Sequence, residues 1–63
     1  MEITAFMGRL LSAITYITLD GSYVSADSGE ALPIAYDPTY DEYTVMIAGR
    51  HFDIFPHEFQ TIT

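Results

Sequence analysis

Cysteine, lysine and tryptophan are all absent from this sequence. Without cysteine there is neither a disulfide framework nor a thiolate metal site, so apolar packing must stabilise the fold. No apolar run is long enough to cross a membrane. The opening residues, MEITAFMGRLL, carry an acid at position 2 and no basic cluster, which is not typical of a signal peptide. We therefore expect a cytoplasmic protein.

Positive charge is also scarce. Arg9 and Arg50 stand with two histidines against nine acids, and the formal net charge is −7. A field of this sign repels nucleic acid and anionic membranes, and it attracts basic protein surfaces. Acidity can equally serve solubility alone. The charge therefore leaves a functional and a purely physical interpretation open.

The chain is short but rich in apolar residues. Its 63 residues predict a single domain, residues 1–63. A chain of this size buries only about 60% of the surface that its unfolded form exposes. Hydrophobic residues nevertheless make up 49% of the sequence. This composition favours a folded domain over a disordered acidic tail, and it leaves apolar surface for a partner or a second copy.

The first fourteen residues carry apolar side chains at helical spacing. The apolar positions are Ile3, Phe6, Met7, Leu10, Leu11 and Ile14. Glu2 suits the positive end of a helix dipole, although Gly8 weakens a helix by about 1 kcal/mol relative to alanine. We expect a helix over residues 3–13 that covers one face of a small sheet.

The stretch from Glu42 to Phe55 predicts a β-hairpin, because apolar and polar residues alternate on both sides of Gly49-Arg50. A two-residue loop there sets the register of the two strands. The expected pairs on the buried face are Ile47 with Phe52 and Val45 with Ile54.

Two further strand signals precede this hairpin. Residues 14–26 predict another hairpin, with Asp20-Gly21 as its turn and Ile17 facing Val24. Residues 31–36 predict a further strand. Pro33 should place that strand at an edge or a bulge, because proline cannot donate a ladder hydrogen bond.

Together these elements predict an α+β fold, with one N-terminal helix packed on an antiparallel sheet of four to five strands. A small curled, SH3-like barrel is the alternative. Residues 35–45, AYDPTYDEYTV, resemble the acidic loop region of SH3 domains.

One cluster has the residue types of a metal site: His51, Asp53, His57 and Glu58. His51 lies at a hairpin turn and His57 follows a proline, and both are ordinary surface positions. The sequence contains neither a GxGxxG nor a Walker loop. We expect no metal, no cofactor and no enzymatic activity.

The acids that fall in predicted turns are the better candidates for function. Turn residues project from a rigid sheet and hold their carboxylates in a fixed array. A neighbouring tyrosine adds contact area, and carboxylates pair with arginine. The predicted partner-binding residues are Asp20, Asp27, Glu30, Asp37, Tyr40, Asp41 and Glu42.

In size and charge the chain is similar to small acidic inhibitors carried by phages and mobile elements. These include anti-CRISPR proteins, DNA-mimicking anti-restriction proteins and uracil-DNA glycosylase inhibitors. The resemblance implies a stoichiometric inhibitor that places carboxylates where phosphates would lie on a basic surface. We expect such an inhibitor, with anti-CRISPR as the leading class. If a phage encodes it, we expect it in the cytoplasm of the host cell.

Two other functions are considered. The protein could be an interaction module or a small homodimeric subunit, whose acidity serves solubility. The expected dimer surface holds Tyr16, Tyr23, Met46 and Phe55 on the sheet face that the helix leaves open. A small metal-dependent enzyme that uses the two histidines is the third hypothesis.

Overall fold

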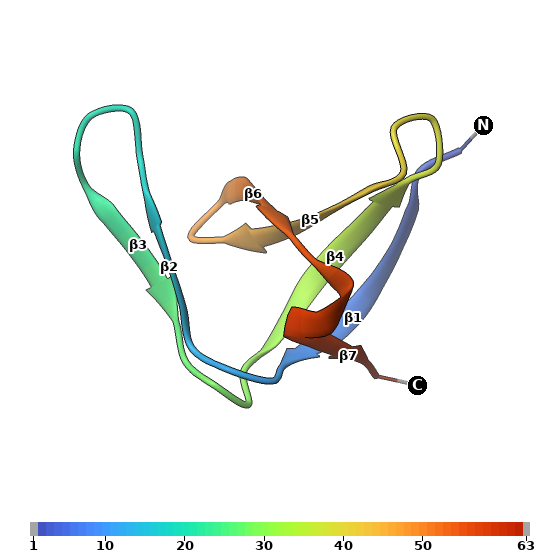
Figure 1. The fold of residues 1–63 in the computed structure, drawn as a ribbon, viewed down its shortest axis with the longest axis horizontal. Helices are drawn as coiled ribbons and strands as arrows, with labels where there is room; N and C mark the ends of the chain where they lie inside the picture. Colours follow the sequence, from blue (N-terminus) through green and yellow to red (C-terminus); the bar gives the residue numbers. More distant parts are fainter. Residues whose placement is uncertain (1, 63) are drawn as a thin grey trace.

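The computed structural model describes residues 2–62 as an almost entirely β protein (Figure 1). The strands are β1 (Thr4–Leu10), β2 (Ile14–Ile17), β3 (Tyr23–Ala26), β4 (Ala31–Asp37), β5 (Glu42–Ile47), β6 (Arg50–Ile54) and β7 (Phe59–Thr61). One turn of 3-10 helix, η1 (Pro56–Glu58), precedes the last strand. Five strands form an antiparallel sheet in the order β6-β5-β4-β1-β7, and β2 pairs only with β3.

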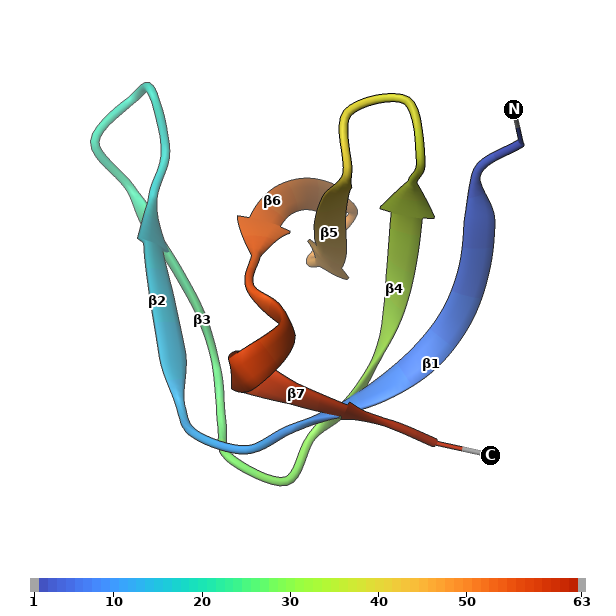
Figure 2. The same ribbon diagram turned by 45° about the vertical axis from the view of Figure 1, so that its right-hand side comes forward.

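The five-stranded sheet curls around its own core. In the sheet order β4 and β1 separate β7 from β5, yet Phe59 of β7 lies against Tyr43 of β5 with ring centroids 5.4 Å apart. Figure 2 shows the strands curving around a common interior, with the β2–β3 hairpin standing beside them. The buried apolar side chains are Leu10, Ile14, Ala26, Ile34, Val45, Ile47, Ile54 and Phe59.

The predicted α+β class is therefore wrong, because the segment expected to form a helix is strand β1 in the interior of the sheet. Phe6, Gly8 and Leu10 are its inward residues, and Ala5, Met7 and Arg9 are exposed. Apolar residues four apart share a helix face, but four is an even number, so they also share a strand face. The spacing of Phe6 and Leu10 fits both structures.

The packing at Gly8 distinguishes the strand from the helix. A Cβ atom at this position would lie 2.7 Å from Cγ1 of Ile34 and 3.1 Å from Cδ2 of Phe59. In β1 the glycine lets β4 and β7 pack closely on it, which is a recognised use of glycine within strands. The residue that weakened the helix prediction is the one that the strand requires.

The β5–β6 hairpin is present, and Val45, Ile47 and Ile54 are buried as predicted. The predicted register is wrong, because Val45 pairs with Phe52 and Ile47 with Arg50. The turn is Ala48-Gly49, and both residues have positive φ, 53° and 76°. A two-residue loop of this kind matches the twist of the strands. The predicted pairing is shifted by two residues from the observed one. Because two is an even number, the same side chains face inward in both registers.

The β2–β3 hairpin is also present, with a different register. Tyr16 pairs with Val24 and Ile17 with Tyr23, whereas Ile17 was expected opposite Val24. The slip is one residue, and it moves Ile17 to the exposed face. A longer loop causes it: the Thr18 amide donates to the Ser22 carbonyl (2.8 Å).

Strand β4 lies in the middle of the sheet, and not at the edge that Pro33 suggested. Pro33 is opposite Met7 in β1, and the Met7 carbonyl accepts a hydrogen bond from the Ile62 amide on the far side. The backbone nitrogen of Pro33 therefore faces the β5 side. Pairing of β4 with β5 extends only from Ile34 to Asp37, so no ladder bond is lost at the proline.

Gly8→Ala tests the strand against the helix. In β1 the added methyl group overpacks the core, and the free energy of unfolding should fall by about 1–3 kcal/mol. In a helix the same change would stabilise by about 1 kcal/mol. Urea unfolding measures the difference, and Ile34→Ala should partly offset the loss in a double-mutant cycle. A more stable Gly8→Ala variant would contradict the observed structure.

Ala48→Asn tests the left-handed turn between β5 and β6. Asparagine tolerates positive φ better than alanine, and Asn-Gly is a preferred type I′ pair. The substitution should raise the free energy of unfolding by about 1 kcal/mol, visible as a higher Tm. Ala48→Val is the matched control and should lower Tm. The turn geometry would be refuted if both variants melted at the same temperature.

Candidate binding site around Phe55

The structure divides the predicted binding acids among three separate turns. Asp20 lies in the β2–β3 turn, and Asp27 and Glu30 lie at the β3–β4 turn. The remaining residues are in or beside the β4–β5 turn: Asp37, Tyr40, Asp41 and Glu42. Figure 1 shows these turns at different corners of the molecule, so the seven residues do not form one array. Only the β4–β5 group is compact.

Hydrogen bonds hold the β4–β5 turn in shape. The Thr39 amide donates to Oδ1 of Asp37 (3.0 Å), an Asx turn that fixes this carboxylate. The Tyr36 hydroxyl donates to Oδ1 of Asp41 (2.7 Å). Asp41 has a φ of 51°, and aspartate is among the few residues that adopt this conformation readily. The carboxylates of Asp37 and Asp41 are therefore positioned by the fold.

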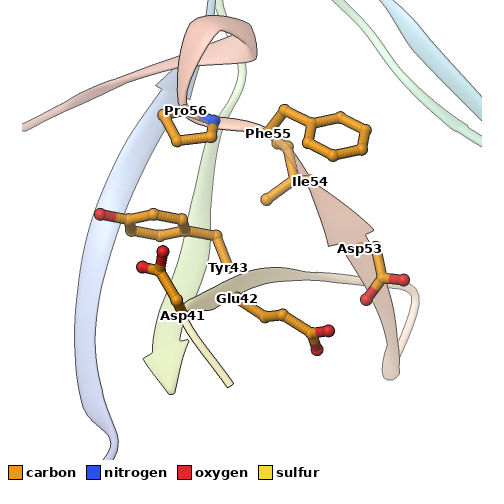
Figure 3. Close-up of a pocket in the computed structure, with 7 residues that line it drawn as sticks. All are labelled: Asp41, Glu42, Tyr43, Asp53, Ile54, Phe55 and Pro56. Carbon is orange, nitrogen blue, oxygen red and sulfur yellow. The ribbon is translucent and has the colours of Figure 1, made fainter. Parts of the chain in front are cut away.

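A hollow opens next to this turn, and we call it the β5–β6 hollow. Its cavity volume is about 290 Å³. It is lined by Asp41, Glu42, Tyr43, Asp53, Ile54, Phe55 and Pro56. Figure 3 shows Asp41 beside the Tyr43 ring, and Glu42 and Asp53 on the side toward which the Phe55 ring points. Three carboxylates thus surround a floor made by apolar side chains.

A second hollow, the β2 hollow, has a volume of about 480 Å³. It is lined by Ala13, Ile14, Thr15, Tyr16, Asp53, Phe55, His57 and Glu58. Asp53 and Phe55 line both hollows, so the two share a wall. Tyr16 fixes the β2 hairpin to this wall, because its ring stacks on Phe52 (4.5 Å) and its hydroxyl donates to the Asp53 carbonyl (2.7 Å).

The pKa values of two tyrosines on this side of the molecule are raised, and carboxylates are among the causes. The hydrogen bond to Asp41 is the main cause that raises the pKa of Tyr36, with smaller contributions from desolvation and from Asp37. Burial is the main cause that raises the pKa of Tyr16, followed by the charges of Glu58 and Asp53. Each phenolate is disfavoured mainly by the first of these causes, and nearby carboxylates add to the effect.

The β2–β3 turn uses its acid differently. The side chain of Asp20 is hydrogen-bonded to the Thr18 hydroxyl and accepts from the Ser22 amide (3.1 Å). These bonds lower the pKa of Asp20, with the Thr18 contact as the first cause. This carboxylate shapes its own turn, which gives it a structural role that the sequence analysis did not assign.

Sequence reasoning missed Asp53, Phe55 and Pro56 as site residues. They follow Glu42 by eleven or more positions, and only the pairing of β5 with β6 brings them beside it. One signal was available: in both the predicted and the observed register, Asp53 lies on the same face of the hairpin as Glu42.

The metal hypothesis finds no geometric support in the part of the chain that the structure describes. Within residues 2–62 no three His, Cys, Asp or Glu side chains come together as a group that could hold a metal ion. His57 instead stacks on Phe55, with ring centroids 6.0 Å apart. Across the same residues, no helix has the length and apolar character needed to span a membrane.

The four residues of the expected dimer surface do not share one face. Tyr16 and Phe55 line the β2 hollow, and Met46 lines a different hollow on the outer face of the sheet with Ala5 and Pro33. Tyr23 is exposed on the β2–β3 hairpin. The prediction placed all four residues on one sheet, whereas Tyr16 and Tyr23 belong to the separate β2–β3 pair.

No known family model matches the chain, and no curated protein or solved structure shows significant similarity to it. The site must therefore be interpreted from its own geometry.

Asp41→Asn tests the geometry of the β4–β5 turn. Asparagine still accepts the Tyr36 hydrogen bond but carries no charge, so the pKa of Tyr36 should fall toward its ordinary value. The ring resonances of Tyr36, followed by NMR through an alkaline titration, measure this pKa. Asp27→Asn removes one charge from a different turn and should leave it nearly unchanged. Equal effects of the two variants would argue against the Tyr36–Asp41 contact.

Proposed function

We propose that this protein is a stoichiometric inhibitor that binds the basic nucleic-acid-binding surface of a defence or nucleic-acid-processing complex. An anti-CRISPR protein that acts by nucleic-acid mimicry is the leading class. In this role the carboxylates occupy the arginines and lysines that otherwise contact phosphate. Inhibition then requires no catalysis, only a surface that competes with DNA or RNA.

The observation that carries the proposal is the gathering of Asp41, Glu42 and Asp53 around one apolar hollow, with Asp37 on the adjoining turn. Tyr40 on the same turn is exposed and offers contact area. The chain has only two arginines with which to neutralise nine acids, and the guanidinium of Arg9 is engaged by the Gly29 carbonyl (2.7 Å).

A homodimeric subunit is the second candidate, and a different surface favours it. Met7 and Met46 are 43% and 37% exposed on the outer face of the sheet. Met46 lines a shallow hollow there with Ala5, Pro33 and Ala35. An apolar patch of this kind suits a protein contact. Light scattering over a concentration series would show a species above 7.1 kDa if this candidate is right.

The test of inhibition is competition. The protein is titrated into CRISPR effector complexes and other basic nucleic-acid-binding proteins, and loss of nucleic-acid binding is measured by gel shift. A variant with Asp37→Asn, Asp41→Asn and Glu42→Gln keeps the side-chain shapes and removes three charges. If each exposed ion pair contributes about 0.2–1 kcal/mol, inhibition should weaken by about 3- to 150-fold. Inhibition should also weaken as salt rises.

The matched control removes three charges from the other turns, through Asp20→Asn, Asp27→Asn and Glu30→Gln. Circular dichroism and Tm establish that both variants fold. If the control loses inhibition as strongly as the β4–β5 variant, net charge alone is responsible. If neither variant nor salt changes binding to a partner that is found, the acids are a solvated surface and the outer apolar face becomes the contact.

A further inference from the structure

Phe55 is a large apolar side chain left 62% exposed, and its position is fixed from two sides. Its amide donates to Oε1 of Glu58 (2.9 Å) at the start of η1. Its ring stacks on His57 at an interplanar angle of 10°. Because the next residue is Pro56, the backbone of Phe55 is held extended. An exposed aromatic ring held in place is well suited to recognition, since little side-chain entropy remains to be lost on binding.

This ring forms the ridge between the two hollows, and carboxylates lie on both sides of it. The β5–β6 hollow holds Asp41 and Glu42, the β2 hollow holds Glu58, and Asp53 borders both. Arginine and lysine are absent from the lining of either hollow. The raised pKa of Tyr16 is consistent with a negative field in the β2 hollow.

Each hollow also has apolar side chains in its lining. Tyr43, Ile54 and Pro56 line the first, and Ala13 and Ile14 line the second. A small cation would not cover the apolar residues of the lining. An apolar side chain would not pair with the carboxylates. Arginine meets both requirements, because its methylene stem packs on apolar groups while the guanidinium reaches carboxylates. The planar guanidinium also stacks on an aromatic face such as that of Phe55.

The shared wall sets the spacing of the ligand. Asp53 and Phe55 line both hollows, so the two hollows are adjacent. Alternate residues of an extended chain project to the same side about 7 Å apart. An extended segment could therefore place residues i and i+2 on either side of the ridge.

We propose that the two hollows bind an extended segment with arginines at alternate positions, Arg-x-Arg, one arginine on each side of Phe55. The inference rests on the proposed function and specifies the chemistry of the partner. It extends the contact surface beyond the acids of the β4–β5 turn to Asp53, Phe55 and Glu58.

The test uses ¹⁵N-labelled protein and capped synthetic peptides in an NMR titration at low salt. The first peptide is Gly-Ser-Arg-Ser-Arg-Ser-Gly. The second has the same composition with adjacent arginines, Gly-Ser-Ser-Arg-Arg-Ser-Gly, and in the third glutamine replaces both arginines. The alternate peptide should shift the amide signals of Asp53, Phe55 and Glu42 and bind more tightly than the adjacent one. The glutamine peptide should leave these signals in place.

Two variants and two controls locate the contact. Phe55→Ala should weaken the alternate peptide by about two- to fivefold if the exposed ring contributes an ordinary cation–π contact. Asp53→Asn should weaken it by a similar factor, about two- to fivefold. Tyr23→Ala removes an exposed ring elsewhere, and Asp27→Asn removes a charge elsewhere. Both controls should bind like the parent protein.

The proposal is overturned if the peptide shifts signals equally at all the acidic turns, if adjacent and alternate arginines bind alike, or if Phe55→Ala has no effect. Its failure is distinguishable from failure of the proposed function. If the Phe55→Ala variant still inhibits an effector complex, the proposed inhibitor function stands and the binding of Arg-x-Arg in the two hollows is rejected. If the peptide binds specifically but the protein inhibits no nucleic-acid-binding protein, Arg-x-Arg binding in the two hollows stands and the inhibitor function is rejected.

Discussion

Close packing over Gly8 is the contact on which the rest of the structure depends. Ile34 from β4 and Phe59 from β7 both approach the place where a Cβ atom would stand. This approach lets β1 hold β4 on one side and β7 on the other, and it brings Phe59 against Tyr43 across the core. Once β7 is docked, η1 is fixed in front of it. The ridge at Phe55 and the hollows beside it thus follow from an absent side chain in the middle of the sheet.

A sequence pattern predicts structure well when it is compatible with only one type of secondary structure. Alternation on both sides of a glycine-containing turn has one solution, so the β5–β6 hairpin and its buried face were predictable from Val45, Ile47 and Ile54. The spacing of Phe6 and Leu10 fits both a helix and a strand, and the sequence analysis chose the helix. What excludes the helix is a contact of Gly8 with residues 26 and 51 positions away, which no local pattern contains.

The same limit applies to the site. The acids of the β4–β5 turn are neighbours in sequence, so their grouping was predictable. Asp53, Phe55 and Pro56 join them only through strand pairing. The sequence analysis named binding acids on all three turns, whereas Asp20 is tied to its own turn and Glu30 accepts a hydrogen bond from the Asp27 amide (2.7 Å). Asp41 and Glu42 differ from these acids because they also line a hollow.

The energetics of exposed carboxylates favour one continuous contact over isolated pairs. A single exposed ion pair contributes about 0.2–1 kcal/mol, far too little for a useful inhibitor. Many such pairs must act together on a surface that is partly desolvated, and the apolar floors of the hollows provide that condition. A standard interface takes about 800 Å² from each partner, roughly a fifth of the 4455 Å² that this molecule exposes.

The β4–β5 turn, the β5–β6 hollow and the β2 hollow are linked through Asp41, Asp53 and Phe55. One partner surface of ordinary size can therefore cover all three. The proposed function therefore rests on this continuity more than on the net charge of −7, which an acidic surface that serves only solubility would share.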